Sequence, residues 1–187
     1  MSESIDQIIA ENPGMAGEAL NIRLRRIIFE NSSIKAKRAR VIKIADEHVM
    51  ALTAYAACKV GCSHCCRLSI PILEHEAKKL EEASGRAMTR LVHRSLEEVA
   101  LAGLQFVGKP CPFLVDDRCS VYESRPLVCR VHHSLNEDDS ACAENVSLNP
   151  IREVIMYDPD ALEVPYLYLN SRLRAREPFG NIGEFFP

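Results

Sequence analysis

Apolar residues recur every three to four positions between residues 34 and 56, which is the spacing of one face of an amphipathic helix. The residues of this face are Ile34, Val41, Ala45, Val49, Leu52 and Ala56. Charged residues of the same segment fall largely on other faces. The serine hydroxyls at Ser32 and Ser33 suit an N-cap. We therefore predict a long helix that begins after Ser33, runs directly into Cys58 and stops near Gly61.

Other segments also carry helical signals. A helical region is predicted to begin near Met15, and residues 73–83 predict a helix with Gly85 as its C-terminal stop. Pro126 suits the first turn of a short helix that carries Cys129. One more helix, ending at about residue 101, is predicted from a face formed by Met88, Val92, Leu96, Val99 and Gly103.

A small β-hairpin is predicted where residues 113–115 and 120–122 flank Asp116 and Asp117. The predicted fold class is therefore mainly α: a small helical domain with a cysteine-rich loop region and one short β-hairpin. Two groups of cysteines are separated by enough chain for a helical hairpin that returns to its starting point.

The length of 187 residues fits one domain of ordinary size. We expect a flexible N-terminal lead-in over residues 1–14, which ends at an Asn-Pro-Gly turn signal. Residues 15–187 then form a single helical domain with a cysteine-cluster core at about residues 50–145. The aromatic end, residues 183–187, suits either a docking peptide or a segment that folds back on its own domain, and we favour the second interpretation.

Composition and charge narrow the class of protein. An apolar content of 47% and a charged content of 26% are typical of a soluble globular protein. The net charge of −3 gives no general bias toward nucleic acid, and we interpret the basic residues 35–40 as a solvated helix face. The apolar stretch 49–58 is too short to span a membrane, and the N-terminus lacks the pattern of a signal peptide. We therefore expect a cytoplasmic protein.

The cysteines form an unusual pattern. Residues 58–66 read CKVGCSHCC, and more cysteines follow downstream. In a reducing cytoplasm such thiols are more often metal ligands than disulfides, and the adjacent Cys65 and Cys66 cannot easily serve two ordinary bridges. The candidate metal ligands are Cys58, Cys62, Cys65, Cys66, Cys111, Cys119, Cys129 and Cys142.

Thiolates at this spacing suit zinc or iron, including an iron–sulfur cluster. Cys62 and Cys65 form a CxxC knuckle, and Cys58 is predicted to lie one helical turn before it. Two tetrahedral zinc ions would use eight ligands, or fewer with bridging thiolates, whereas a four-iron cluster would use four. The spacing alone leaves the metal and the number of sites open.

Neighbouring residues suggest further roles. The basic residues Lys59, Arg67, Arg118 and Arg130 adjoin cysteines, where they can offset thiolate charge or simply face solvent. His64, His132 and His133 are candidate fourth ligands or acid–base groups, although a role outside the metal site is the commoner one for a histidine.

The central residues resemble the YkgJ-type cysteine-cluster family, described as a zinc- or iron-chelating domain. The matching segments are CKVGCSHCC at 58–66 and KPCPFLVDDRCSVYESRPLVCR at 109–130, followed by Cys142. The resemblance implies metal coordination by the cysteines of both segments. A related cluster occurs in flagellin lysine methylases, where an iron–sulfur centre is implicated, but this chain is too short to resemble those enzymes in full.

The leading hypothesis is a metal-binding protein whose cysteine cluster holds zinc or an iron–sulfur cluster and stabilises the fold. The alternative is an iron–sulfur-dependent redox or protein-modifying enzyme that uses the same cluster, so we leave catalysis undecided. Metal delivery and a thiol–disulfide switch are further classes. A metal ion is the expected partner; no membrane or clear nucleic-acid binding is expected, and the pattern identifies no protein partner.

Overall fold

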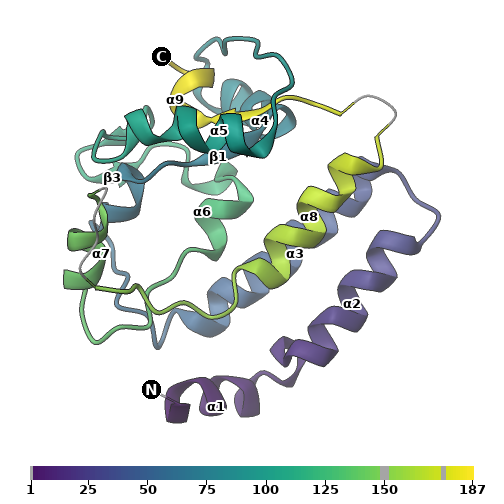
Figure 1. The fold of residues 1–187 in the computed structure, drawn as a ribbon. Helices are drawn as coiled ribbons and strands as arrows, with labels where there is room; N and C mark the ends of the chain where they lie inside the picture. Colours follow the sequence, from purple (N-terminus) through teal and green to yellow (C-terminus); the bar gives the residue numbers. More distant parts are fainter. Residues whose placement is uncertain (1, 148–151, 174–175) are drawn as a thin grey trace.

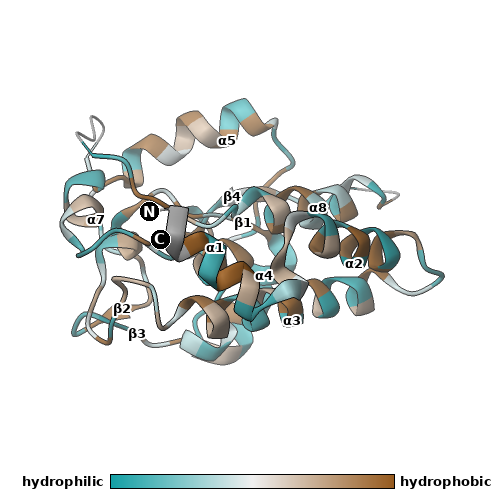
Figure 2. Ribbon diagram, turned by 90° about the horizontal axis from the view of Figure 1, so that it is seen from below, coloured by the Kyte–Doolittle hydropathy of each residue, from teal (hydrophilic) through white to brown (hydrophobic). Residues whose placement is uncertain are grey.

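A computed structural model describes residues 2–147, 152–173 and 176–187 of the chain. Three helices form one half of the fold: α2 (Gly17–Phe29), α3 (Ile34–Leu52) and α8 (Asp160–Ser171). They pack against one another around a shared apolar cluster (Figure 1). Hydrophobic and hydrophilic residues alternate along them (Figure 2), as expected for amphipathic helices with one buried face. The predicted mainly α class is confirmed.

Helix α3 has the predicted N-cap but ends earlier than predicted. The Ser33 hydroxyl accepts a hydrogen bond from the Ala36 N–H at 3.2 Å. The last helical residue is Leu52, so the helix does not run into Cys58. Past this point the Ala57 N–H donates to the Ser134 carbonyl at 2.9 Å, a partner outside the helix. This contact draws the chain away from the helix axis before the first cysteine, which therefore does not lie one helical turn before Cys62.

The other half of the fold contains α4 (Glu74–Ser84), α5 (Leu96–Gly103) and the C-terminal α9 (Ile182–Phe185). Strands β1 (Pro71–Leu73) and β4 (Phe179–Asn181) pair antiparallel between them. Gly85 ends α4 in the left-handed conformation, with φ 72°, as predicted. The sequence did not predict the β1–β4 pair, because its strands are very short and lie far apart in the chain.

The aromatic C-terminus folds back on the domain, as we favoured. Phe185 and Phe186 are buried in a second apolar cluster. The Phe186 ring meets the Phe113 ring edge to face, with the ring centroids 4.8 Å apart. This places the C-terminus against the segment that follows Cys111.

One predicted helix is shorter than expected. Residues 88–95, which we placed in a helix, are not helical, and α5 begins only at Leu96. Ser95 and Glu98 form a capping box there, because the Ser95 hydroxyl accepts from the Glu98 N–H while the Glu98 carboxylate accepts from the Ser95 N–H. Leu91 packs against the second apolar cluster from a non-helical segment. This side chain is therefore partly buried although its segment is not helical.

The β-hairpin is present, with strands β2 (Leu114–Val115) and β3 (Arg118–Cys119). Asp116 and Asp117 adopt left-handed φ values of 49° and 56°, which suit a tight two-residue turn. The second strand begins before the predicted position, because a two-residue turn pairs Cys119 with Leu114. Cys119 thus lies on a strand.

Shorter helices complete the fold. These are α1 (Ser2–Glu11), α6 (Leu127–Val131), α7 (Ser140–Asn145) and the 3₁₀ turns Pro13–Met15, His64–Arg67, Leu104–Phe106 and Tyr122–Ser124. The expected flexible lead-in contains α1, where Ile8 is buried. The division of the chain into a lead-in over residues 1–14 and a single domain over residues 15–187 stays a prediction. As predicted, α6 follows Pro126 and carries Cys129. Among the helices that the structure describes, none combines the length and apolar character needed to cross a membrane.

Candidate metal centre

The eight cysteines are all free thiols, and they come from many different elements. Cys58 and Cys62 lie in the loop after α3, and Cys65 and Cys66 lie in the 3₁₀ turn His64–Arg67. Cys111 lies in a loop, whereas Cys119, Cys129 and Cys142 lie on β3, α6 and α7. In Figure 1, α7 lies on the side of the fold away from α2, and α6 lies between α7 and α8. Seven of the thiols are half-buried and Cys142 is buried.

One set of cysteines is brought together by backbone contacts with the first motif. The Cys111 N–H donates to the Cys66 carbonyl at 2.7 Å. Cys119 pairs across the hairpin with Leu114, just after Cys111. Cys111, Cys119 and Cys129 all pack against the apolar cluster that contains Phe113. We name Cys66, Cys111, Cys119 and Cys129 the downstream set.

A second set is organised by Ser134, which is fully buried. Its carbonyl accepts from the Ala57 N–H, beside Cys58, and its backbone N–H forms a hydrogen bond with the Cys58 thiol. Its side chain forms a hydrogen bond with the Cys142 thiol. Ser134 therefore joins the first motif to α7. We name Cys58, Cys62, Cys65 and Cys142 the upstream set.

Cys65, a member of the upstream set, also contacts the downstream set. It forms a hydrogen bond with the Cys66 thiol. A charge on Cys65 also acts on thiols of both sets, namely Cys58, Cys62, Cys142, Cys111 and Cys129. The structure thus gathers the cysteines into one continuous region.

Burial raises the pKa of most of these thiols above the usual range, and neighbouring cysteines raise it further. This holds for Cys58, Cys62, Cys111, Cys129 and Cys142. The pKa of Cys111 rises to about 11. For Cys65 the hydrogen bond with Cys66 raises the pKa most, followed by burial. Without a cation the thiols are therefore neutral near pH 7, whereas a bound cation stabilises the thiolate.

Glu76 holds the helix that carries Cys129, a member of the downstream set, and it was not singled out in the sequence. Its buried carboxylate accepts the Leu127 N–H at 2.9 Å and the Leu73 N–H at 3.0 Å. The first bond holds the start of α6, the helix that carries Cys129. The second holds the chain where β1 leads into α4. A buried carboxylate with amide partners is a positioning group for that helix.

One of the basic residues beside the cysteines, Arg130, serves partners other than the thiols. Arg130 pairs with Asp46 and donates to the Arg125 carbonyl at 2.8 Å, so it joins α6 to α3 and to the segment that precedes α6. The positive charges that lower the pKa of thiols come from Arg125, acting on Cys65, and from Arg86, acting on Cys111. For Arg130, adjacency in sequence did not predict adjacency in space.

Of the three candidate histidines, His64 lies among possible ligands. Its Nε2 lies 3.4 Å from Asp139 Oδ2. Ligand atoms of Cys62, His64 and Asp139 all lie within 4.8 Å of one another. His132 and His133 follow α6, and burial lowers the pKa of both. His133 is buried, and its Nδ1 has no hydrogen-bond partner among the described residues.

Across residues 2–147, 152–173 and 176–187, that trio is the one group of three Cys, His, Asp or Glu donors with this spacing. No three cysteine sulfurs of the described chain therefore lie so close. Sulfurs around a tetrahedral zinc ion are about 3.8 Å apart, since each Zn–S bond is about 2.3 Å. A closed four-thiolate site thus requires the side chains of one set to turn toward a common ion.

Comparison with protein families gives a match over residues 57–146, which contain all eight cysteines. The matching family is CxxCxxCC, described as a putative zinc- or iron-chelating domain. The chain is thus similar to the CxxCxxCC family over 90 of its 187 residues. The same comparisons find no matching curated protein and no matching solved structure.

The donor set of the CxxCxxCC segment fits a soft or borderline cation. Eight free thiols gather in a partly buried region, where each thiolate would repel its neighbours. Zinc and iron both accept thiolate ligands, and either cation would offset this repulsion. Ser134, Glu76 and Asp139 belong to the same region but gave no signal in the sequence, because their partners are distant in the chain.

Proposed function

We propose that the chain is a metal-binding protein in which zinc or iron bound by two four-cysteine sets stabilises the fold. The upstream set is Cys58, Cys62, Cys65 and Cys142, and the downstream set is Cys66, Cys111, Cys119 and Cys129. The observation that carries the proposal is the proximity of Cys65 to free thiols of both sets: it forms a hydrogen bond with the Cys66 thiol, and its charge acts on Cys58, Cys62, Cys142, Cys111 and Cys129. The hydrogen bonds of Ser134 and Cys111 support the division into two sets.

The chain's own residues suit a stabilising role for the metal. The elements that carry the cysteines are short: α6 is 5 residues long, α7 is 6 and β3 is 2. Such elements bury little apolar area by themselves. A structural zinc site contributes about 10–16 kcal/mol of apparent binding free energy, comparable with the stability of a whole domain, about 5–15 kcal/mol. Metal that joins these elements can therefore decide whether residues 58–142 are folded.

The first experiment is metal and acid-labile sulfide analysis of protein purified without air, together with a visible spectrum. Zinc in a colourless protein supports two structural sites. Iron with matching sulfide supports a cluster and leads to tests of the redox or protein-modifying alternative. Protein with neither zinc nor iron, and with no tight binding of either after anaerobic addition, overturns the proposal.

A stability measurement tests whether the metal holds the fold. Cys129→Ser should lower metal content and the melting temperature together, and a chelator should lower the melting temperature of the wild type. Leu24→Ala is the matched control, because Leu24 is buried in the cluster of α2, α3 and α8 and should lower stability without metal loss. Full metal content with unchanged melting of Cys129→Ser would contradict the structural role.

A further inference from the structure

We propose that Cys62, His64 and Asp139 form a capture site where a divalent transition-metal ion first binds before it passes to the inner cysteines. This inference rests on the proposed metal-binding function. It assigns to His64 and Asp139 a role in loading the metal, and it makes Cys62 the ligand shared by the capture site and the upstream set.

The three side chains converge from two segments. Cys62 and His64 belong to the first cysteine motif, and Asp139 immediately precedes α7, which carries Cys142. Their ligand atoms lie within 4.8 Å of one another, a separation that one ion can bridge with small side-chain movements. The side chains of His64 and Asp139 are 32% and 38% exposed. The group is therefore reachable from solvent, unlike the buried Cys142.

The donor types determine which ion fits. One sulfur, one imidazole nitrogen and one carboxylate oxygen suit borderline ions such as Zn²⁺, Fe²⁺ and Co²⁺. Three protein ligands leave a coordination position for water, which is the arrangement of open zinc sites rather than closed structural ones. An ion held in this way can exchange ligands readily, whereas a closed four-thiolate site offers no free position.

A cleft of about 410 Å³ gives solvent access to this group. Its charged lining consists of Asp117, Asp139, Lys59 and Arg67, besides His64. The Ser63 hydroxyl donates to Asp117 Oδ1 at 2.9 Å, which fixes one wall of the cleft against the hairpin turn. Carboxylates at the mouth of a cleft attract cations, and the two basic side chains oppose this effect. Within the part of the chain that the structure describes, Asp139 forms an ion pair with no side chain other than His64.

Transfer to the upstream set is an exchange of ligands around one ion. The ion keeps its bond to the Cys62 thiolate, while its bonds to His64 nitrogen and Asp139 oxygen break. New bonds form to the sulfurs of Cys58, Cys65 and Cys142, whose protons pass to water in the cleft, and the bound water leaves. The ion stays divalent throughout, so no oxidant or reductant is needed. Cys58 and Cys65 are close enough to Cys62 for their charges to raise its pKa, which places the inner ligands next to the shared one.

A simple ion pair between His64 and Asp139 does not account for the third member of the group. At 3.4 Å and with both side chains partly exposed, such a pair contributes little to stability. It also gives no reason for the Cys62 thiol to lie within reach of both. A capture site accounts for all three positions.

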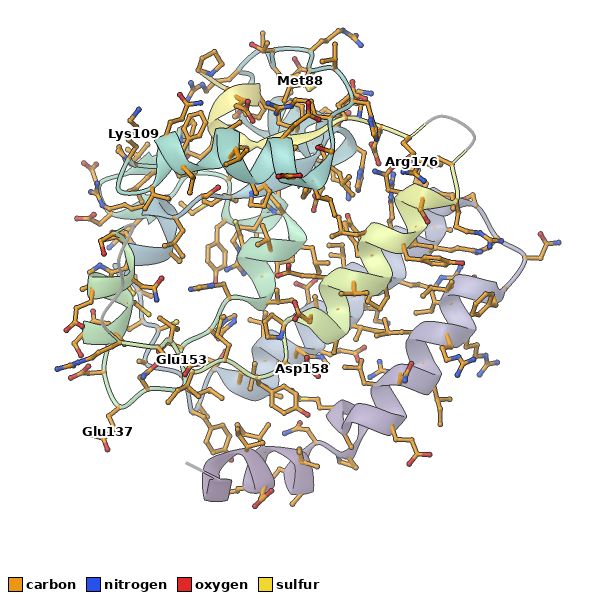
Figure 3. All side chains as sticks on the ribbon, viewed as in Figure 1. Met88, Lys109, Glu137, Glu153, Asp158 and Arg176 are labelled. Carbon is orange, nitrogen blue, oxygen red and sulfur yellow. The ribbon has the colours of Figure 1, made fainter. Side chains whose placement is uncertain are left out.

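The test is the rate of anaerobic Co²⁺ loading, followed by its visible absorption in a stopped-flow instrument, with final metal content measured separately. The variants are His64→Ala and Asp139→Asn. Matched controls are His93→Ala, at an exposed histidine, and Glu137→Gln, in the same acidic loop. The Glu137 side chain points away from the protein (Figure 3). His64→Gln serves as a second variant if His64→Ala does not fold, as judged by circular dichroism.

We expect wild-type protein to pass through an early species with one thiolate ligand before the multi-thiolate spectrum develops. Both site variants should load about tenfold more slowly, the scale on which a charged cleft raises association rates, yet reach the same final metal content as the controls. Loading at the wild-type rate in both variants would overturn the capture site. So would a lower final metal content at an unchanged rate, because the residues would then be permanent ligands. Failure of the wild type to bind any metal would instead overturn the proposed function.

Discussion

The Cys111 N–H donates to the Cys66 carbonyl at 2.7 Å, so the two cysteine motifs meet through their backbones. The Gly108 N–H donates to the Arg67 carbonyl at the same distance, which extends the contact along the chain. Residues 67–110 therefore leave the first motif, form α4 and α5, and return to it. These bonds hold Cys66 beside Cys111 through the backbone, without requiring any side-chain contact.

The division into two sets predicts a pattern of metal loss. Cys58→Ser and Cys142→Ser should each remove the metal of the upstream set, and the double variant should lose no more than either alone, because one ion or cluster is lost in each case. Cys58→Ser combined with Cys119→Ser should lose the metal of both sets. Metal content per folded chain is the measurement. If every double variant lost as much metal as the sum of its two single variants, whichever sets the cysteines came from, the division would be refuted.

Ser134→Ala tests the residue that joins Cys58 and Cys142. The substitution removes the hydroxyl that contacts the Cys142 thiol and donates to Asn136 Oδ1 at 2.8 Å. Because the site is fully buried, the unpaired groups should lower the free energy of unfolding by about 1–3 kcal/mol, measured by urea unfolding. Ser147→Ala, at an exposed hydroxyl, is the control and should have little effect. If both variants had the same free energy of unfolding, Ser134 would not be the residue that holds Cys58 and Cys142 together.

Glu76→Gln tests the support beneath Cys129. Both carboxylate oxygens accept backbone N–H groups, and an amide side chain can offer an acceptor to only one of them. We expect a loss of about 1–3 kcal/mol in unfolding free energy and weaker metal retention by the downstream set during chelator challenge. The control is Glu82→Gln, at an exposed glutamate on the same helix. Unchanged stability and retention in Glu76→Gln would contradict the positioning role.

Glu177 predicts a pH dependence of stability away from the cysteines. Burial alone would raise its pKa, but the hydrogen bond from His75 and the charges of His75 and Arg38 lower it overall. A lowered carboxyl pKa stabilises the folded state at pH values above the unfolded pKa, about 4.3. That stabilisation is lost as the pH falls through the lower folded pKa.

The measurement is the difference in unfolding free energy between wild type and Glu177→Gln from neutral pH down to about pH 3. The advantage of the wild type should be largest at neutral pH and shrink with acid. Loss of metal in acid affects both proteins and therefore cancels in the difference. Glu97→Gln, at an exposed glutamate, is the control and should show no such trend. A constant difference across the range would contradict the prediction.

Local patterns predicted much of the secondary structure. Ser33, Gly85 and Pro126 marked real helix boundaries, because caps and stops depend on residues a few positions away. The same reasoning failed at the end of α3, where the contact of Ala57 with Ser134 replaced the next helical bond. It failed again over residues 88–95, where Met88 and Leu91 pack against the second apolar cluster without forming a helix.

The sequence by itself determined the mainly helical class, the hairpin and the concentration of thiols in residues 58–142, because these follow from residue type and short spacing. Only the tertiary structure decided which cysteines lie together, since Cys142 reaches Cys58 through the distant Ser134. It also placed Asp139 beside His64, and Glu76 beneath α6. Contacts of this kind depend on how separate elements pack, and no local pattern in the chain encodes that packing.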